Sequence, residues 1–151
     1  SVRPGKPNKA ASSFASGIIR EPLAGIDAVC PVAPETAMWV TSPRTVIDNL
    51  IVGHEAPGVG FGPLRAVNVP GFCVSAGEMV AALERVAGAE VVSRIKWERD
   101  PKVVKVVATW PGAIDTTRAR SLGFPGDDSF DDIVRRHIDD EKTSGVFLPK
   151  A

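Results

Sequence analysis

Basic and amide side chains gather close to the start of the sequence, in a turn between a short strand-like segment and a predicted helix over residues 9–20. The group consists of Arg3, Lys6, Asn8 and Lys9. In open α/β sheets, ligands bind at the carboxyl ends of strands, and arginine or lysine placed there can hydrogen-bond a carboxylate. The turn is therefore a candidate site for an anionic substrate. A solvated basic turn with no ligand has the same composition and stays as the alternative.

A glycine-rich stretch, Gly58-Val-Gly60-Phe-Gly62, has the composition of a loop that binds pyrophosphate. Its spacing differs, because Pro63 follows and the chain continues into a predicted strand. A pyrophosphate loop must open a helix so that helical N–H groups face the phosphates. We interpret the stretch as a flexible loop.

Other chemistries have weaker support. The sequence contains no GxSxG nucleophile elbow, and the spacing of its histidines and cysteines (His54, His137, Cys30 and Cys73) matches no zinc motif. Both histidines are predicted to be surface or helix-cap residues. Both cysteines lie in apolar strand-like stretches, which favours buried thiols in a reducing compartment and leaves a disulfide between them open.

An acidic cluster comprises Asp127, Asp128, Asp131 and Asp132. We interpret it as negative charge at the start of a helix, where it complements the helix dipole. Its spacing is not that of a calcium loop.

Composition excludes several classes of partner. The 151 residues contain 18 Lys+Arg and 18 Asp+Glu, so the formal net charge is zero, and no basic stripe indicates nucleic-acid binding. The apolar runs are too short for a transmembrane helix, and no signal peptide is visible. These features predict a cytoplasmic protein with neither a nucleic-acid nor a membrane partner.

Helix caps organise the rest of the chain. Four predicted helix starts carry a serine or aspartate as the capping residue. Ser42 and Asp100 stand directly before a proline, and Ser75 and Ser129 stand three residues before an acidic residue. Short strands are predicted at residues 28–32, 37–41, 64–69 and 95–98. This helix-rich pattern with short strands predicts an α+β fold, or part of a larger α/β protein. The strand stub at residues 2–3 favours the second option, because so short a strand needs a sheet to join.

The order of several weak motifs resembles a known family. The motifs are RPGKPNKAASSF, SPRTVIDNL, AVNVPG, VSAGEMVAAL, DPKVVKVVATWPG and DTTRARSLGF. Over residues 1–141 the chain resembles the C-terminal half of an extended short-chain dehydrogenase/reductase of the NAD-dependent epimerase/dehydratase group, most closely its D-erythronate dehydrogenase branch.

The resemblance implies a two-part enzyme. A Rossmann domain, expected N-terminal to this chain, would carry the NAD loop and the catalytic Ser/Thr, Tyr and Lys. Residues 1–141 would form the substrate-binding domain and residues 142–151 a flexible tail. Because the sequence contains no tyrosine, we expect this chain alone to be inactive and to bind no NAD firmly.

The resemblance also suggests substrate contacts. Asn8 matches an asparagine that often contacts substrate, and Arg3 and Lys6 would neutralise a carboxylate. Arg44 follows Ser42-Pro43, where relatives carry an acidic pair. Residues 34–39 lack the arginine with which relatives bind nucleotide sugars, so a small sugar acid similar to D-erythronate is favoured. The alternatives are a stand-alone binding or assembly module and half of a nucleotide-sugar epimerase or dehydratase. Homo-oligomerisation is left open.

Overall fold

The computed structural model describes residue 2 and residues 11–144. Its core is helical: α3 (Ala76–Ala87) packs against α1 (Phe14–Leu23) on one side and α7 (Phe130–Ser144) on the other. A short 3-10 turn, η1 (Ala11–Ser13), leads into α1. The largest fully buried aliphatic side chains come from these three helices: Ile18, Ile19, Met79, Leu83, Ile133 and Val134.

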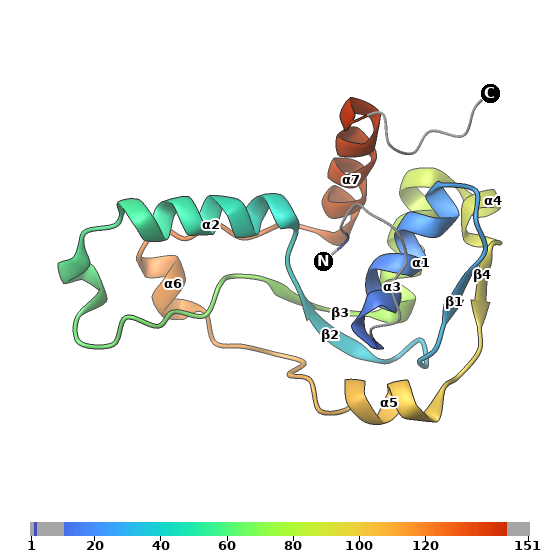
Figure 1. Cartoon of the computed structure of the whole chain (residues 1–151), viewed down its shortest axis with the longest axis horizontal. Helices are drawn as coiled ribbons and strands as arrows, with labels where there is room; N and C mark the ends of the chain where they lie inside the picture. Colours follow the sequence, from blue (N-terminus) through green and yellow to red (C-terminus); the bar gives the residue numbers. More distant parts are fainter. Residues whose placement is uncertain (1, 3–10, 145–151) are drawn as a thin grey trace.

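Short strands lie beside this helical core (Figure 1). In the described part of the chain, β1 (Ala28–Cys30) pairs in parallel with β4 (Ile95–Trp97), and β2 (Ala37–Val40) pairs antiparallel with β3 (Phe72–Ser75). Helices α4 (Ala89–Val92) and α5 (Pro101–Val107) flank β4 in sequence. The predicted α+β, helix-rich architecture is confirmed. None of the helices described is long and apolar enough to cross a membrane.

A second group of elements extends from the core as an arm, on the left of Figure 1. It comprises α2 (Pro43–Glu55), the 3-10 turn η2 (Gly58–Phe61) and α6 (Thr117–Ser121). The arm has its own small apolar cluster, in which the rings of Phe61 and Phe124 meet edge to face at 6.3 Å. A cluster this small leaves much of the arm's apolar surface exposed.

The predicted caps are confirmed. Ser42 Oγ accepts from the N–H of Thr45, and Asp100 accepts from the N–H of Lys102. At the start of α7, Ser129 Oγ accepts from the N–H of Asp132 at 3.1 Å. Helix α7 then runs through Lys142 to Ser144, so the first residues of the predicted tail are helical. The rest of that tail lies outside the described residues.

The start of α3 is a complete capping box. Ser75 Oγ accepts from Glu78 N at 3.2 Å, and Glu78 Oε2 accepts from Ser75 N at 2.7 Å. We expect Ser75→Ala to lower the free energy of unfolding by about 1 kcal/mol, because one N–H of the first turn loses its partner. Urea unfolding followed by circular dichroism measures this. Ser75→Thr, which keeps the hydroxyl, is the control and should lie close to wild type; equal losses in both variants would contradict a capping role.

One of the four strand predictions needs correction. Residues 64–69 form no strand, because no other segment in the described part of the chain pairs with them. The strand β3 follows instead at Phe72–Ser75, directly before the α3 cap, and it pairs with β2. Val2, in the predicted strand stub, is buried in the main core but lies in no strand.

The prediction for His137 was wrong. This side chain is 4% exposed, because the face of α7 that carries it turns toward the core. Burial lowers the pKa of His137, and the Arg20 guanidinium lowers it further while the Glu141 carboxylate opposes the change. His54, near the end of α2, is exposed as predicted.

The cysteines are both free in the structure. Cys30 is fully buried in β1, and burial raises the pKa of its thiol. Cys73 is exposed, which corrects the prediction of a buried thiol. Its strand β3 presents alternate side chains to opposite faces, and Val74 occupies the buried face.

Candidate functional site

Of the four predicted substrate contacts, only Arg44 lies in the described part of the chain. Arg3, Lys6 and Asn8 lie outside the described residues and stay predictions. Arg44 lies in the first turn of α2, where its Nε donates to Asp140 of α7 at 3.0 Å. This hydrogen bond raises the pKa of Arg44. The pair is exposed, and Arg44 does not line the cavity described next.

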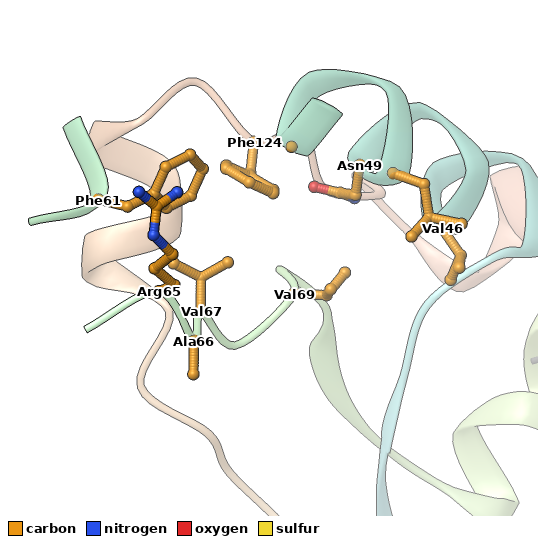
Figure 2. A pocket seen from close by; sticks show the side chains of 10 residues that line it. Val46, Asn49, Phe61, Arg65, Ala66, Val67, Val69 and Phe124 are labelled. Atoms are coloured by element: carbon orange, nitrogen blue, oxygen red, sulfur yellow. The ribbon is translucent and has the colours of Figure 1, made fainter. Parts of the chain in front are cut away.

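A cavity with a volume of about 550 Å³ lies in the arm, between α2 and the extended residues 64–69 (Figure 2). Its wall is mostly apolar, with one amide and one guanidinium. The lining residues are Val46, Asn49, Leu50, Gly53, Phe61, Arg65, Ala66, Val67, Val69 and Phe124.

One face of α2 supplies the upper wall of this cavity. Val46, Asn49, Leu50 and Gly53 recur at the spacing of a single helical face. The exposed apolar stripe continues round the helix, since Ile47 is 56% exposed, Leu50 68% and Ile51 50%. A single exposed leucine is ordinary, but an exposed row on one helix face indicates a surface that another element covers.

The side-chain nitrogen of Asn49 has hydrogen-bond partners, whereas its side-chain oxygen has none among the described residues. Its Nδ2 donates to the carbonyl oxygens of Thr45, at 2.6 Å, and Pro125, at 3.0 Å. Both partners are acceptors, which fixes the orientation of the amide. Oδ1 then faces the cavity side (Figure 2), and this buried atom has no hydrogen-bond partner among the described residues. A buried acceptor without a donor costs about 1–3 kcal/mol, so a ligand or partner that supplies a donor here would relieve that cost.

Arg118 of α6 holds the opposite wall. Its guanidinium donates to the carbonyl of Ala66 at 3.0 Å and also to the carbonyls of Phe61 and Leu64. Further along, Asn68 Nδ2 donates to the carbonyl of Asp115 at 3.0 Å. These bonds keep the segment extended across the arm, with Val67 and Val69 half-buried on the cavity side.

Asp127 anchors the start of α2. Its buried carboxylate accepts from Ser42 N, Ser42 Oγ and Thr45 Oγ1, each at 2.7 Å, and from Thr41 Oγ1 and Arg136 at 3.1 Å. Burial acts to raise the pKa of Asp127, but the hydrogen bonds from Ser42, Thr45 and Thr41 outweigh burial and lower it. Asp127 was predicted to lie with the other aspartates at the start of the last helix, but its carboxylate is bonded at the start of α2 instead. Asp131 and Asp132 do occupy the first turn of α7.

The lining of this cavity offers apolar contacts, one amide and one guanidinium. Its lining contains an arginine and an asparagine but no carboxylate, histidine, cysteine or lysine that could exchange protons at neutral pH. In the described part of the chain, no group of three or more metal-ligating side chains comes together. The sequence reasoning missed this site, although the heptad-like spacing of Val46, Asn49, Leu50 and Gly53 was a signal that could have indicated it.

The glycine-rich stretch does not have the form of a pyrophosphate-binding loop. The glycine-rich stretch forms the 3-10 turn η2 and ends at Gly62, whose φ is +56°. The chain then continues in extended form past Pro63 and not into an α-helix. Helical N–H groups that would face a pyrophosphate are therefore not available there. The interpretation of this stretch as a loop is corrected to a short 3-10 turn.

Comparison with known proteins defines the class. No family model matches the chain. The solved structure of a nucleoside-diphosphate-sugar epimerase from Agrobacterium tumefaciens aligns with a TM-score of 0.91 at 40% identity, covering 94% of this chain and 42% of that one. Over most of its own length, the chain therefore resembles part of an enzyme of the epimerase/dehydratase type.

Two curated relatives of this chain are both named D-erythronate dehydrogenase. A D-erythronate dehydrogenase from Cupriavidus necator is 54% identical over 93% of this chain, and one from Haemophilus influenzae is 44% identical over 91%. The chain spans 43% and 44% of the length of these relatives. The predicted family resemblance is therefore confirmed.

Proposed function

We propose that this chain forms the substrate-binding part of an NAD-dependent oxidoreductase that acts on a hydroxyl group of a small sugar acid such as D-erythronate. The observation that carries the proposal is the 54% identity to a D-erythronate dehydrogenase over 93% of the chain. Because the chain spans less than half of that relative, NAD binding and proton transfer are assigned to a separate N-terminal Rossmann domain. The absence of tyrosine from the sequence supports this division.

The role of this chain is to bind and orient the substrate. Arg3 and Lys6 would pair with the substrate carboxylate, and Asn8 would hydrogen-bond a hydroxyl group. A fixed carboxylate leaves the reacting hydroxyl in one position relative to the catalytic groups of the other domain, which lowers the entropic part of the barrier. Arg44 would join the site only by exchanging its bond with Asp140 for one with the substrate.

A nucleotide-sugar epimerase is the second candidate. It is supported by the 40% identity to the Agrobacterium protein, which is described as an epimerase of nucleoside-diphosphate sugars. The sequence favours the sugar acid, since residues 34–39 contain no arginine to bind a diphosphate. A stand-alone binding module is the third candidate, and a single experiment separates all three.

The test joins this chain in frame to the N-terminal part of the Cupriavidus relative that it does not match. We expect the joined protein to reduce NAD with D-erythronate and the isolated chain to be inactive. Arg3→Gln and Lys6→Gln should each raise KM about tenfold with little change in kcat, because a charge-assisted hydrogen bond to bound substrate is lost. Lys9→Gln is the matched control in the same basic turn and should behave as wild type.

Two results would contradict the proposal. Turnover of a nucleotide sugar but not of D-erythronate would establish the epimerase alternative. A joined protein that binds NAD but turns over neither substrate would favour a binding module.

A further inference from the structure

We infer that the outer edge of β4 is a docking surface for a second copy of this chain, and that the two β4 strands pair antiparallel with Trp97 at the centre. The two-stranded sheet β1-β4 of one copy then continues into that of the other across a two-fold axis. The inference is independent of the substrate in the proposed function. The β4 edge is defined as residues 94–100.

One edge of β4 is paired and the other is open. On the paired side, β1 donates to the carbonyl of Arg94 at 2.9 Å and accepts from the N–H of Glu98 at 3.1 Å. Successive residues of a strand point their N–H and C=O groups to opposite sides, so the odd-numbered residues of this segment point away from β1. Among the strands of the described chain, β1 is the sole neighbour of β4. The residues on the open edge are Ile95, Trp97 and Arg99.

The open edge is accessible and carries a large apolar side chain. Strand β4 lies on the right of Figure 1, at the end of the molecule opposite the arm. Trp97 is 43% exposed, and Lys96, Glu98 and Arg99 are exposed as well. An exposed strand edge is a template for pairing with another strand, and an indole on it offers apolar area for a partner to cover.

The charges along this edge are complementary to themselves. Residues 94–100 read RIKWERD. Antiparallel pairing about Trp97 places Lys96 opposite Glu98 of the second copy, and Arg94 opposite Asp100 of the second copy. The two-fold axis repeats each pair. These are the positions of an antiparallel ladder that share no backbone hydrogen bonds, where facing side chains are closest, so opposite charges there stabilise the pairing.

The same charges select one register and one partner. A shift of two residues in either direction keeps the backbone pairing but places Lys96 opposite Lys96, or Glu98 opposite Glu98, of the second copy, and like charges directly opposite are destabilising. Charged residues, lysine above all, commonly prevent an edge strand from pairing. On this edge every charge of the central pairs meets its counter-charge only in the register centred on Trp97, which favours a second copy over an unrelated strand.

The test measures self-association of the 151-residue chain by sedimentation equilibrium. At about 100 μM, where a dimer with a Kd of about 10 μM is mostly formed, we expect twice the 15.9 kDa mass of one chain. Lys96→Glu and Glu98→Lys should each raise Kd at least about tenfold, because each turns two attractive pairs into repulsive ones. The double variant exchanges the two charges and should return Kd to within about threefold of wild type.

Two controls separate the edge from other effects of charge. Asp27→Asn removes the ion pair that Lys96 makes within the chain at 2.8 Å and leaves the edge unchanged. Lys105→Glu reverses an exposed lysine on α5, outside the edge. Both variants should associate as wild type does.

A wild-type chain that is monomeric at this concentration would overturn the inference. So would a dimer that neither single reversal weakens or that the double variant fails to restore, because its interface would lie elsewhere. Where circular dichroism shows that a variant is unfolded, amide hydrogen exchange of the wild-type dimer replaces it. The N–H groups of Trp97 and Arg99 should then be protected to within about tenfold of that of Glu98, and fast exchange at both would refute the pairing.

Discussion

Asp127→Ala is expected to lower the free energy of unfolding of this chain by about 3 kcal/mol. The carboxylate accepts hydrogen bonds from Thr41, Ser42, Thr45 and Arg136, and its side chain is fully buried. Its removal leaves several donors at the start of α2 without an acceptor, and breaking a buried charged network is among the costliest single changes. The free energy is measured by urea unfolding followed by circular dichroism.

Asp128→Ala is the matched control for this variant. Asp128 is the next residue, has the same side chain and is exposed, so its replacement should change stability by less than about 0.5 kcal/mol. Equal effects of the two substitutions would show that Asp127 acts only through local charge and not as a buried anchor.

The effect of Asp127→Ala should depend on pH. The hydrogen bonds from Ser42, Thr45 and Thr41 overcome burial and hold the pKa of Asp127 below its usual value. A carboxyl group whose pKa is lower in the folded state stabilises the fold above its unfolded pKa of about 3.9, and this stabilisation is lost as pH falls through the folded pKa. The stability difference between wild type and Asp127→Ala should therefore be constant near pH 7 and shrink below about pH 4.

Local signals predicted the helices well because their physical cause is local. A capping side chain acts on N–H groups two or three residues away, so the caps at Ser42 and Ser75 could be recognised from sequence spacing alone. The order of weak motifs also sufficed for the family resemblance, because relatives share it over most of the chain.

Long-range partners were not predictable in the same way. Asp127 lies far along the chain from Ser42, and nothing in its own neighbours indicates that it will be buried. His137 was placed at the surface because its helix is highly charged, yet the tertiary packing of α7 buries it. For residues 64–69 the pattern of a strand is present and the partner is not, because pairing depends on a second segment.

The candidate site could not be predicted from sequence either, because it also depends on partners distant in the chain. Asn49 stands in an amphipathic helix, where sequence alone shows only a polar residue on an apolar face. Its significance comes from two carbonyl oxygens, of Thr45 and Pro125, that occupy its Nδ2 and leave Oδ1 toward the cavity. The carbonyl of Pro125 is brought there by the turn that follows α6, a contact between residues distant in sequence.

Gly71→Ala is expected to destabilise the chain by about 2–3 kcal/mol. A Cβ atom at this position would lie 2.7 Å from Trp39 Nε1 and still closer to the carbonyl oxygen of Val40. Both neighbours belong to β2, and Val40 pairs with Phe72, so the backbone oxygen cannot move without disturbing the sheet. Overpacking of this kind costs about 1–3 kcal/mol, and it is measured by urea unfolding, with tryptophan fluorescence as a second probe because Trp39 is displaced.

Gly112→Ala provides the matched control, since no atom lies within 4 Å of a Cβ built there and its φ is not positive. We expect this variant to lie within about 0.5 kcal/mol of wild type. If both variants behave alike, β2 and β3 adapt freely and the close approach at Gly71 has no cost. A loss confined to Gly71→Ala would instead show that the backbone of Val40 and the ring of Trp39 cannot move to admit a Cβ atom.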